Sequence, residues 1–243
     1  MNKIKPATNE IYHIYNRGVE KRKIFLDDSD HFRFIHDLFE FNDEEAALNV
    51  GYFIARHPLQ SIEGNLQYIK PKRGVHEPRK FIVEILAFCL MPNHFHLLLS
   101  QKMEGGITKF MLKLGTGYTN YFNEKYERVG SLFQGTYKLA HVKTDAHFIH
   151  LPYYIHLNPL DIKMPEWREG GLKDPKKALD YLENYRWSSF LDYIGKKNFP
   201  SVTQREFLLK FFNGPMAYKK GMARWIKEAN LESISHLTLE PIY

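Results

Sequence analysis

Hydrophobic and aromatic residues gather in four short runs along the chain that are typical of β-strands. The first, "EIYHIYNRG", alternates apolar and aromatic residues and then enters a loop at Asn-Arg-Gly. The second and third, "KFIVEILAFCL" and "HFHLLLS", are separated only by "MPN", so they predict a hairpin. The four predicted strands cover residues 10–18, 80–90, 94–100 and 135–143.

Longer stretches between and after these strands have the spacing of helices. Residues 27–42 begin with capping residues and continue with apolar residues at helical intervals. Residues 105–126 predict a second helix. Residues 145–158 predict a third, with Asp145 suited to cap its start, Pro152 expected to kink or split it, and Pro159 expected to stop it.

The elements follow one another as β-α-β-β-α-β and then a helix. This order predicts an α+β fold with a ferredoxin-like split βαβ antiparallel sheet and helices on one face. We expect one domain over residues 1–160, with an insertion at about 43–79 that lacks clear periodicity. Residues 161–243 predict a C-terminal helical extension, in which 203–230 give one or two amphipathic helices.

Composition narrows the classes of protein that the chain fits. Hydrophobic residues make up 44% of the 243 residues, so a folded core is expected. No apolar run reaches the roughly 20 residues that span a bilayer. The single cysteine, Cys89, excludes an internal disulfide and fits a reducing cytoplasm. The net charge of +6 suggests an anionic partner.

Two histidines in the third predicted strand are candidates for chemistry. Side chains at positions i and i+2 of a strand point the same way, so His94 and His96 project together. Two neutral imidazoles side by side suit a divalent metal, since each offers one lone pair. Taken alone, the pair also fits two core histidines that are hydrogen-bonded to the backbone.

The third predicted helix carries further polar groups. His150, Tyr154 and Asn158 are four residues apart and form one stripe on it. The amide oxygen of Asn158 can bind a hard cation, or the side chain can simply cap the helix. Tyr154 can equally pack its ring in the core.

Several motifs in order resemble those of the single-tyrosine HUH transposases, and most closely the REP-associated tyrosine transposases. The His-Phe-His strand after Met-Pro-Asn is followed some sixty residues later by "YIHLNP". "YHIYNRG" stands near the start, "SLFQGTYK" before the last strand and "YRWSSF" after the tyrosine helix. The resemblance covers most of residues 10–195, leaving out the insertion.

The resemblance implies a role for individual residues. It implies His94, His96 and Asn158 as ligands of Mg²⁺ or Mn²⁺, and Tyr154 as the nucleophile that forms a 5′-phosphotyrosine link and leaves a free 3′-OH. The neighbouring Tyr153 lies about 100° round the helix and off the Asn158 stripe. His150, one turn before Tyr154, is a possible helper that removes the phenol proton.

The resemblance also implies single-stranded or hairpin DNA as the substrate, which a DNA transposase or endonuclease would nick and rejoin. We expect Arg17, Lys21 and Arg22, in the basic loop after the first strand, to contact its phosphates. The expected location is the cytoplasm, associated with the nucleoid, and the state is a monomer or a homodimer. Two alternatives stay open: a domesticated hairpin-DNA-binding protein that does not cleave, and a metal-dependent hydrolase of another phosphoester.

Overall fold

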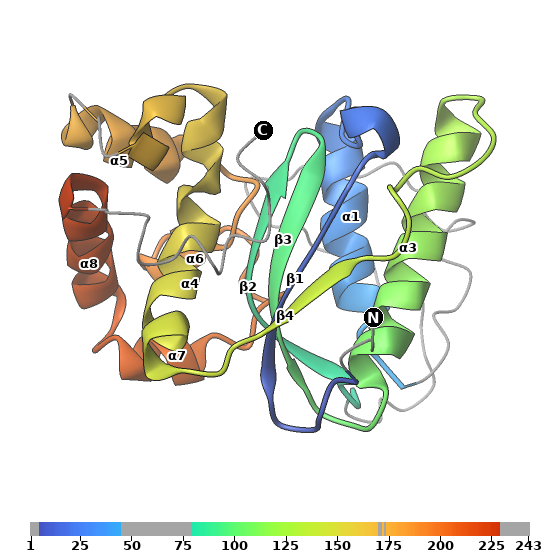
Figure 1. Ribbon diagram of the computed structural model, residues 1–243, viewed down its shortest axis with the longest axis horizontal. Helices are drawn as coiled ribbons and strands as arrows, with labels where there is room; N and C mark the ends of the chain where they lie inside the picture. Colours follow the sequence, from blue (N-terminus) through green and yellow to red (C-terminus); the bar gives the residue numbers. More distant parts are fainter. Residues whose placement is uncertain (1–4, 45–78, 170–171, 173, 229–243) are drawn as a thin grey trace.

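One antiparallel sheet forms the centre of the protein. The structure is a computed structural model that describes residues 5–44, 79–169, 172 and 174–228. Within these residues the sheet has four strands in the order β2-β3-β1-β4 (Figure 1). The strands are β1 (Ile11–Arg17), β2 (Val83–Met91), β3 (His94–Gln101) and β4 (Lys138–His141). Each predicted strand is therefore present.

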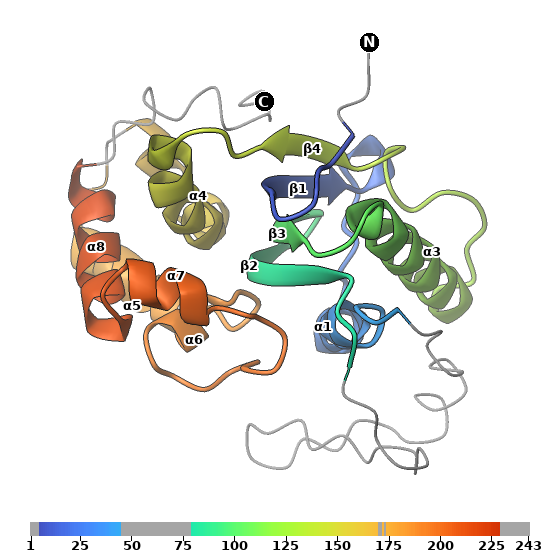
Figure 2. The same cartoon turned by 90° about the horizontal axis from the view of Figure 1, so that it is seen from below.

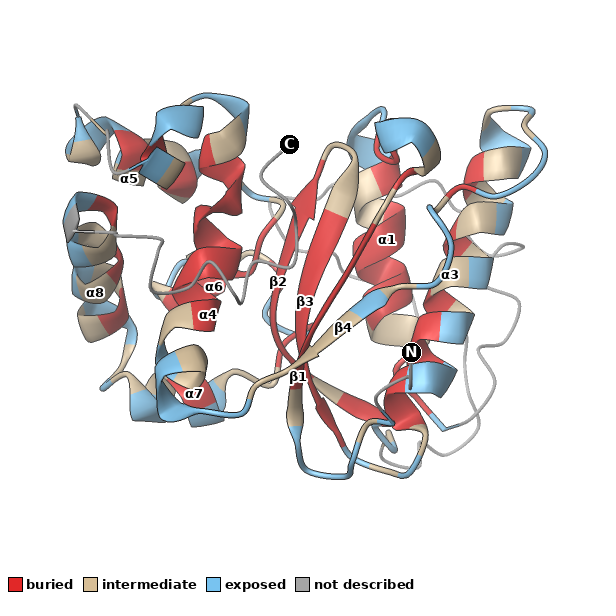
Figure 3. Cartoon of the chain, viewed as in Figure 1, coloured by how far each residue is buried: buried red, intermediate tan, exposed pale blue. Residues whose placement is uncertain are grey.

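The hairpin of β2 and β3 is closed by Pro92 and Asn93, so that Met91 pairs with His94. Strand β1 then pairs antiparallel with β3, and this places Arg17 opposite His94. The central position of β3 and β1 buries most of their side chains (Figure 3). The order and directions are those of the ferredoxin-like fold that the sequence predicts.

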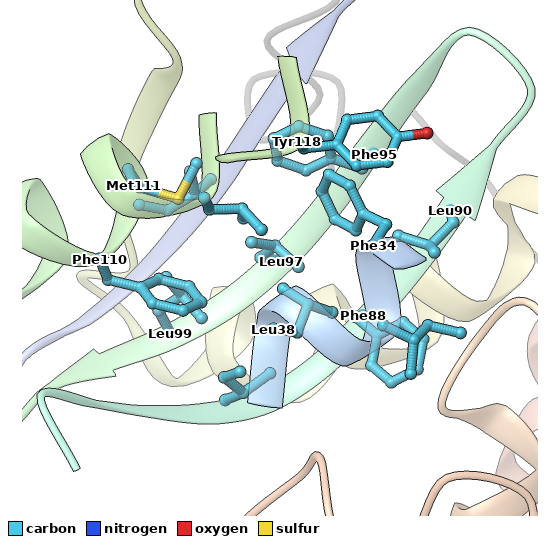
Figure 4. Packing of buried hydrophobic residues seen from close by; sticks show 14 of the residues in the cluster. Phe34, Leu38, Phe88, Leu90, Phe95, Leu97, Leu99, Phe110, Met111 and Tyr118 are labelled. Atoms are coloured by element: carbon cyan, nitrogen blue, oxygen red, sulfur yellow. The ribbon is translucent and has the colours of Figure 1, made fainter. Parts of the chain in front are cut away.

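Two helices cover one face of the sheet. They are α1 (Asp28–Glu40) and α3 (Gly106–Lys125), and both lie on the same side in Figure 2. Helix α1 begins where Asp27 and Asp30 form a capping box, each side chain accepting the other's backbone N–H. Aromatic and aliphatic side chains from both helices and from the strands interdigitate in this core, as Figure 4 shows for Phe34, Phe95 and Tyr118 among others.

A second layer of helices covers the opposite face. Helix α4 (Asp145–Leu157) packs there (Figure 2). It is followed along the chain by the short 3₁₀ helices η2 (Asn158–Ile162) and η3 (Pro165–Glu169). The helices on one face that the sequence predicts are thus α1 and α3, while α4 and the extension lie across the sheet from them. The reason is that β2 and β3 are apolar on both sides: Leu86 and Leu98 belong to the core under α4.

The described part of the C-terminal extension is helical. It contains α5 (Pro175–Asn184), α6 (Phe190–Tyr193), α7 (Glu206–Phe211) and α8 (Pro215–Glu228). The last two confirm the helices predicted at 203–230. The division into domains at residue 160 stays a prediction, and the insertion predicted at 43–79 falls almost entirely outside the described residues. Within the described residues, no helix has the length and apolarity that crossing a membrane requires.

The start and end of α4 differ from the sequence prediction. Its N-cap is Thr144, whose side chain accepts the His147 backbone N–H, and not Asp145. The helix is not split at Pro152. Asn158 keeps helical backbone angles (φ −49°, ψ −36°) although Pro159 follows, and the chain continues directly into η2. Every residue from 151 to 160 is buried, so tertiary packing overrides the local preference of the residue before a proline.

Candidate functional site

The two histidines of β3 lie on the face of the sheet that α4 covers. Their rings are 5.0 Å apart between centroids and nearly perpendicular. His96 is completely buried, while His94, at the turn end of the strand, is partly exposed. The pair is therefore enclosed by protein at the His96 end and partly exposed at the His94 end, where the Nε2 atom itself is buried.

A third histidine, which the sequence analysis did not identify, joins this pair from β1. His13 Nε2 lies 2.9 Å from His96 Nδ1, and the two rings stack with centroids 5.1 Å apart. His13 is 2% exposed. The alternation along "YHIYN" assigns His13 to one face of its strand, but the sequence alone does not tell which strand lies beside it or in what register.

The turn residue Asn93 determines the tautomer of His94. The Nδ1 atom of His94 lies 2.7 Å from the amide oxygen of Asn93. An amide oxygen only accepts hydrogen bonds, so Nδ1 carries the proton and donates it. The lone pair of the ring is then on Nε2, which is the atom available for a metal.

Tyr154 brings its ring from α4 to the buried end of the histidine cluster. Its centroid lies 5.9 Å from that of His96 and 6.2 Å from that of His13, and it meets both rings edge to face. Tyr153 lies on another side of α4, where it stacks on Tyr218 of α8 at 4.7 Å. Only Tyr154 of the two adjacent phenols has its ring among the described contacts of the histidine cluster.

Asn158 is buried at the end of α4 and is held by two hydrogen bonds. Its Nδ2 donates to the carbonyl of Tyr154 at 2.8 Å, and its Oδ1 accepts from Arg168 Nη2 at 3.3 Å. Arg168, on η3, also donates through Nε and Nη2 to the Asp161 carboxylate at 2.8 Å and 2.5 Å. Neither Arg168 nor Asp161 was identified from the sequence, because both lie beyond the motif and reach the site only through the turn that η2 makes.

Burial keeps the enclosed histidines neutral. Burial lowers the pKa of His13 to about 3. Burial first, and then the neighbouring His94, His13 and Arg168, lower the pKa of His96 well below its ordinary value. Burial also lowers the pKa of Arg168, but the Asp161 hydrogen bond and the nearby Tyr154 raise it by more. The site thus combines neutral imidazoles with a permanent cation, whose guanidinium carbon lies 5.7 Å from the centre of the Tyr154 ring.

These residues fit a divalent cation. Within the described part of the chain, the buried Nε2 of His96 has no hydrogen-bond partner, and a bound cation would satisfy it. Among the described residues, no three or more His, Cys, Asp or Glu side chains are grouped so that they could hold a metal. Asn158 offers an amide oxygen with a second lone pair besides the one that Arg168 uses.

The three basic residues predicted to contact DNA lie in different settings. Arg17 is opposite His94 in the β1–β3 register, hence on the same face, and its Nε donates to Gln134 Oε1 at 2.5 Å. Lys21 is exposed. Arg22 forms an ion pair with Glu20 at 3.3 Å, so part of its charge is already compensated.

His150 lies with the C-terminal helices. Its ring centroid is 5.1 Å from that of Trp225 on α8, which also stacks at 6.2 Å on Tyr153. Burial lowers its pKa. Its role as a helper of Tyr154 stays a prediction, and this contact lends it no support.

Comparison with known proteins gives three results. No curated protein matches the chain. The chain is similar to a solved structure described as a REP-associated tyrosine transposase bound to a REP hairpin, with 11% identity and a TM-score of 0.43 over 80% of this chain and 85% of the other. Residues 76–158 match the model of the family "Transposase IS200 like". That segment is about a third of the chain and holds His94, His96, Tyr154 and Asn158.

Proposed function

We propose that the protein is a DNA transposase or endonuclease that nicks and rejoins single-stranded DNA near hairpins through a phosphotyrosine link at Tyr154. The observation that carries the proposal is the position of the Tyr154 ring, edge-on to His96 and His13. Elements far apart in the sequence bring a phenol to a pair of neutral imidazoles. The match of residues 76–158 to a transposase family supports the same conclusion.

His94, His96 and Asn158 would hold a divalent cation, Mg²⁺ or Mn²⁺. When bound, the cation polarises the scissile phosphate and neutralises charge on the leaving oxygen. This mixed set of nitrogen and oxygen donors would suit either ion, and Mn²⁺ accepts imidazole more readily than Mg²⁺ does.

Tyr154 supplies the nucleophile. Its phenol oxygen forms a bond to phosphorus while the bond from phosphorus to the 3′ oxygen breaks, and the phenol proton leaves as a 3′-OH forms. The phosphotyrosine diester keeps the energy of the broken bond, so a 3′-OH can reverse the step without ATP. A free phenol has a pKa near 10, so its proton has to be removed during the attack.

The partner proposed for the site is single-stranded or hairpin DNA. Arg17 stands beside His94 on the open side of the histidine pair, where a phosphate of the strand would approach. Lys21 is also exposed, and its backbone carbonyl accepts a hydrogen bond from Asn93 Nδ2, so its charge lies near the turn that precedes His94. Such contacts to phosphates make affinity depend on salt and not on base sequence.

The decisive experiment is a gel assay for a covalent protein–DNA adduct. The protein is incubated with Mn²⁺ or Mg²⁺ and single-stranded hairpin DNA taken from the flanks of its own gene. We expect an adduct with the wild type and none with Tyr154→Phe, while DNA binding is kept. Tyr153→Phe is the matched control, because it removes the adjacent hydroxyl. An adduct that persists in Tyr154→Phe and disappears in Tyr153→Phe assigns the nucleophile to Tyr153.

One observation favours a second function, that of a hairpin-DNA-binding protein without turnover. The amide oxygen of Asn158 is already hydrogen-bonded to Arg168. If this bond withholds the oxygen from a metal, the site binds DNA but does not cleave it. Salt-dependent binding together with no adduct on any hairpin tested, in either metal, supports this second function and contradicts the first.

A further inference from the structure

The hydrogen bond between His13 and His96 links two strands inside the candidate site. Nε2 of His13 and Nδ1 of His96 are 2.9 Å apart, and both residues are almost completely buried. A buried neutral imidazole has one N–H and one lone pair. One ring must therefore donate the shared proton and the other must accept it. The direction determines whether the outer nitrogen of each ring, Nδ1 of His13 and Nε2 of His96, carries a hydrogen or a lone pair.

The two directions have opposite consequences for a metal. If His13 donates, Nε2 of His96 carries a hydrogen and offers no lone pair to a cation. If His96 donates, its Nε2 carries a lone pair, and the hydrogen of the neutral His13 ring is on its Nδ1. Within the described residues neither of these two outer atoms has a hydrogen-bond partner, so hydrogen bonding by itself does not select the direction.

The second direction is the one that the proposed metal site requires, because only this direction leaves a lone pair on Nε2 of His96. His94 already donates its Nδ1 hydrogen to Asn93, which leaves its own lone pair on Nε2. Arg168 adds a fixed positive charge whose field reaches His96. A lone pair turned toward such a charge is favoured over an N–H, whose hydrogen is itself positive.

We propose that His13 is a positioning residue that accepts the Nδ1–H of His96 and thereby presents the His96 Nε2 lone pair to the metal. The proposal rests on the proposed function and adds to it a group outside the histidine motif. Asn93 does the same for His94, so that each histidine of the pair has its own acceptor from a different part of the fold. Such acceptors orient a ligand ring and make it more basic before the metal arrives.

The tautomers can be observed without metal or DNA. Histidine labelled with ¹⁵N is incorporated into the metal-free protein, and two-bond nitrogen–proton spectra distinguish protonated from bare ring nitrogens. We expect His96 and His13 both to be protonated on Nδ1 and bare on Nε2. A His96 ring protonated on Nε2 overturns the proposal, whatever the protein does to DNA.

Metal affinity tests the consequence. Mn²⁺ binding is measured by calorimetry for the wild type, His13→Leu and His13→Gln. Leu has no acceptor and should weaken binding by about 10- to 100-fold, the range for lost outer-shell partners. Gln offers an amide oxygen and should recover most of the affinity. His141→Leu is the control, since His141 on β4 is bonded to Glu10 and lies outside the site.

Each result then has one meaning. Equal affinity for Mn²⁺ in His13→Leu and the wild type overturns the positioning role, provided the variant is folded by circular dichroism. If His13→Leu does not fold, the comparison of His13→Gln with the wild type decides, because a loss of more than tenfold with Gln contradicts a role as acceptor. Normal tautomers and Mn²⁺ binding without a DNA adduct leave the role of His13 standing and refute the proposed DNA cleavage.

Discussion

Nη2 of Arg168 lies 3.3 Å from the amide oxygen of Asn158, so a residue ten positions further along the chain determines how that side chain is turned. The opposite end of the amide donates to the Tyr154 carbonyl. Flipping the amide would turn its NH₂ group toward a guanidinium, which also only donates. Asn158 is therefore held with its amide oxygen toward the guanidinium of Arg168. The Asp161 carboxylate in turn holds Arg168 through two hydrogen bonds.

Replacement of Arg168 by lysine should destabilise the protein. Lysine keeps the charge but loses the planar fork that donates to Asp161 from two nitrogens. We expect the free energy of unfolding to fall by about 1.5–3 kcal/mol, the range for hydrogen bonds to charged groups, as measured in urea. Lys196→Arg, at an exposed ion pair, is the control and should change little. An unchanged stability of Arg168→Lys contradicts the importance of this network.

Mn²⁺ should stabilise the fold through His94. A ligand that binds only the folded state at 100 times its Kd adds about 2.7 kcal/mol. For a chain of this size that corresponds to a rise in Tm of about 5–10 °C. His94→Gln should abolish the rise, whereas His141→Gln should keep it. If both variants respond to Mn²⁺ as the wild type does, the cation binds somewhere other than at the histidine pair.

His156 should make the metal-free protein less stable in acid. Its two ring nitrogens are hydrogen-bonded to Tyr218 and Ser189 at 2.8 Å, and the aromatic ring of Tyr193 also faces it. Burial lowers its pKa from 6.5 to about 3. Between pH 6.5 and about 3, this imidazole is protonated in the unfolded chain but neutral in the folded protein. The contribution of His156 to the free energy of unfolding is therefore complete above pH 6.5 and is lost as the pH falls toward 3.

The slope attributable to this histidine is about 1.4 kcal/mol per pH unit. His13, whose pKa burial also lowers to about 3, adds to the wild-type slope over the same range. Urea denaturation at pH 4, 5 and 6 gives the free energy of unfolding as a function of pH. In His156→Gln its slope should be smaller than in the wild type by the amount that one proton contributes. An identical slope in the variant and the wild type would mean that His156 is protonated in the folded protein.

Gly221 should be required for α8 to pack on α4. A Cβ built at this position would overlap the hydroxyl of Tyr153. We expect Gly221→Ala to lower the free energy of unfolding by about 1–3 kcal/mol, the usual cost of overpacking. Adding Tyr153→Phe removes the overlapping oxygen and should restore part of the loss, which a double-mutant cycle would measure.

The control for this substitution is Gly115 on α3. A Cβ there meets no atom within 4 Å. Gly115→Ala should therefore stabilise the protein by about 0.5–1 kcal/mol, because alanine restricts the unfolded chain more than glycine does. If both alanine variants gain stability alike, α8 does not depend on close contact at Gly221.

The sequence predicted the sheet because its strands differ from its helices in period. In the strands, apolar residues occur at every second position or in short continuous runs. In α1 they recur at intervals of three or four residues. The same period of two, which is a local property of the chain, assigned His94 and His96 to a common face of the sheet. The "MPN" turn likewise predicted which two strands form the hairpin, and the structure closes it at Pro92 and Asn93.

Other features were beyond local patterns. Asn158 keeps a helical backbone before Pro159 because its whole neighbourhood is buried, and burial is a property of the fold. The apolar character of both faces of β2 and β3 called for a second helical layer, but no local signal said that α4 would provide it.

By itself, then, the sequence determined the order of the elements, the shared face of the two histidines and the residues that resemble a transposase motif. Only the tertiary structure decided that His13 is hydrogen-bonded to His96, that Tyr154 and not Tyr153 lies beside them, and that Arg168 holds Asn158. The physical reason is the range of the interactions. Periodicity and turns act over a few residues, whereas strand register and helix packing are set by contacts between segments that the chain separates by tens of residues.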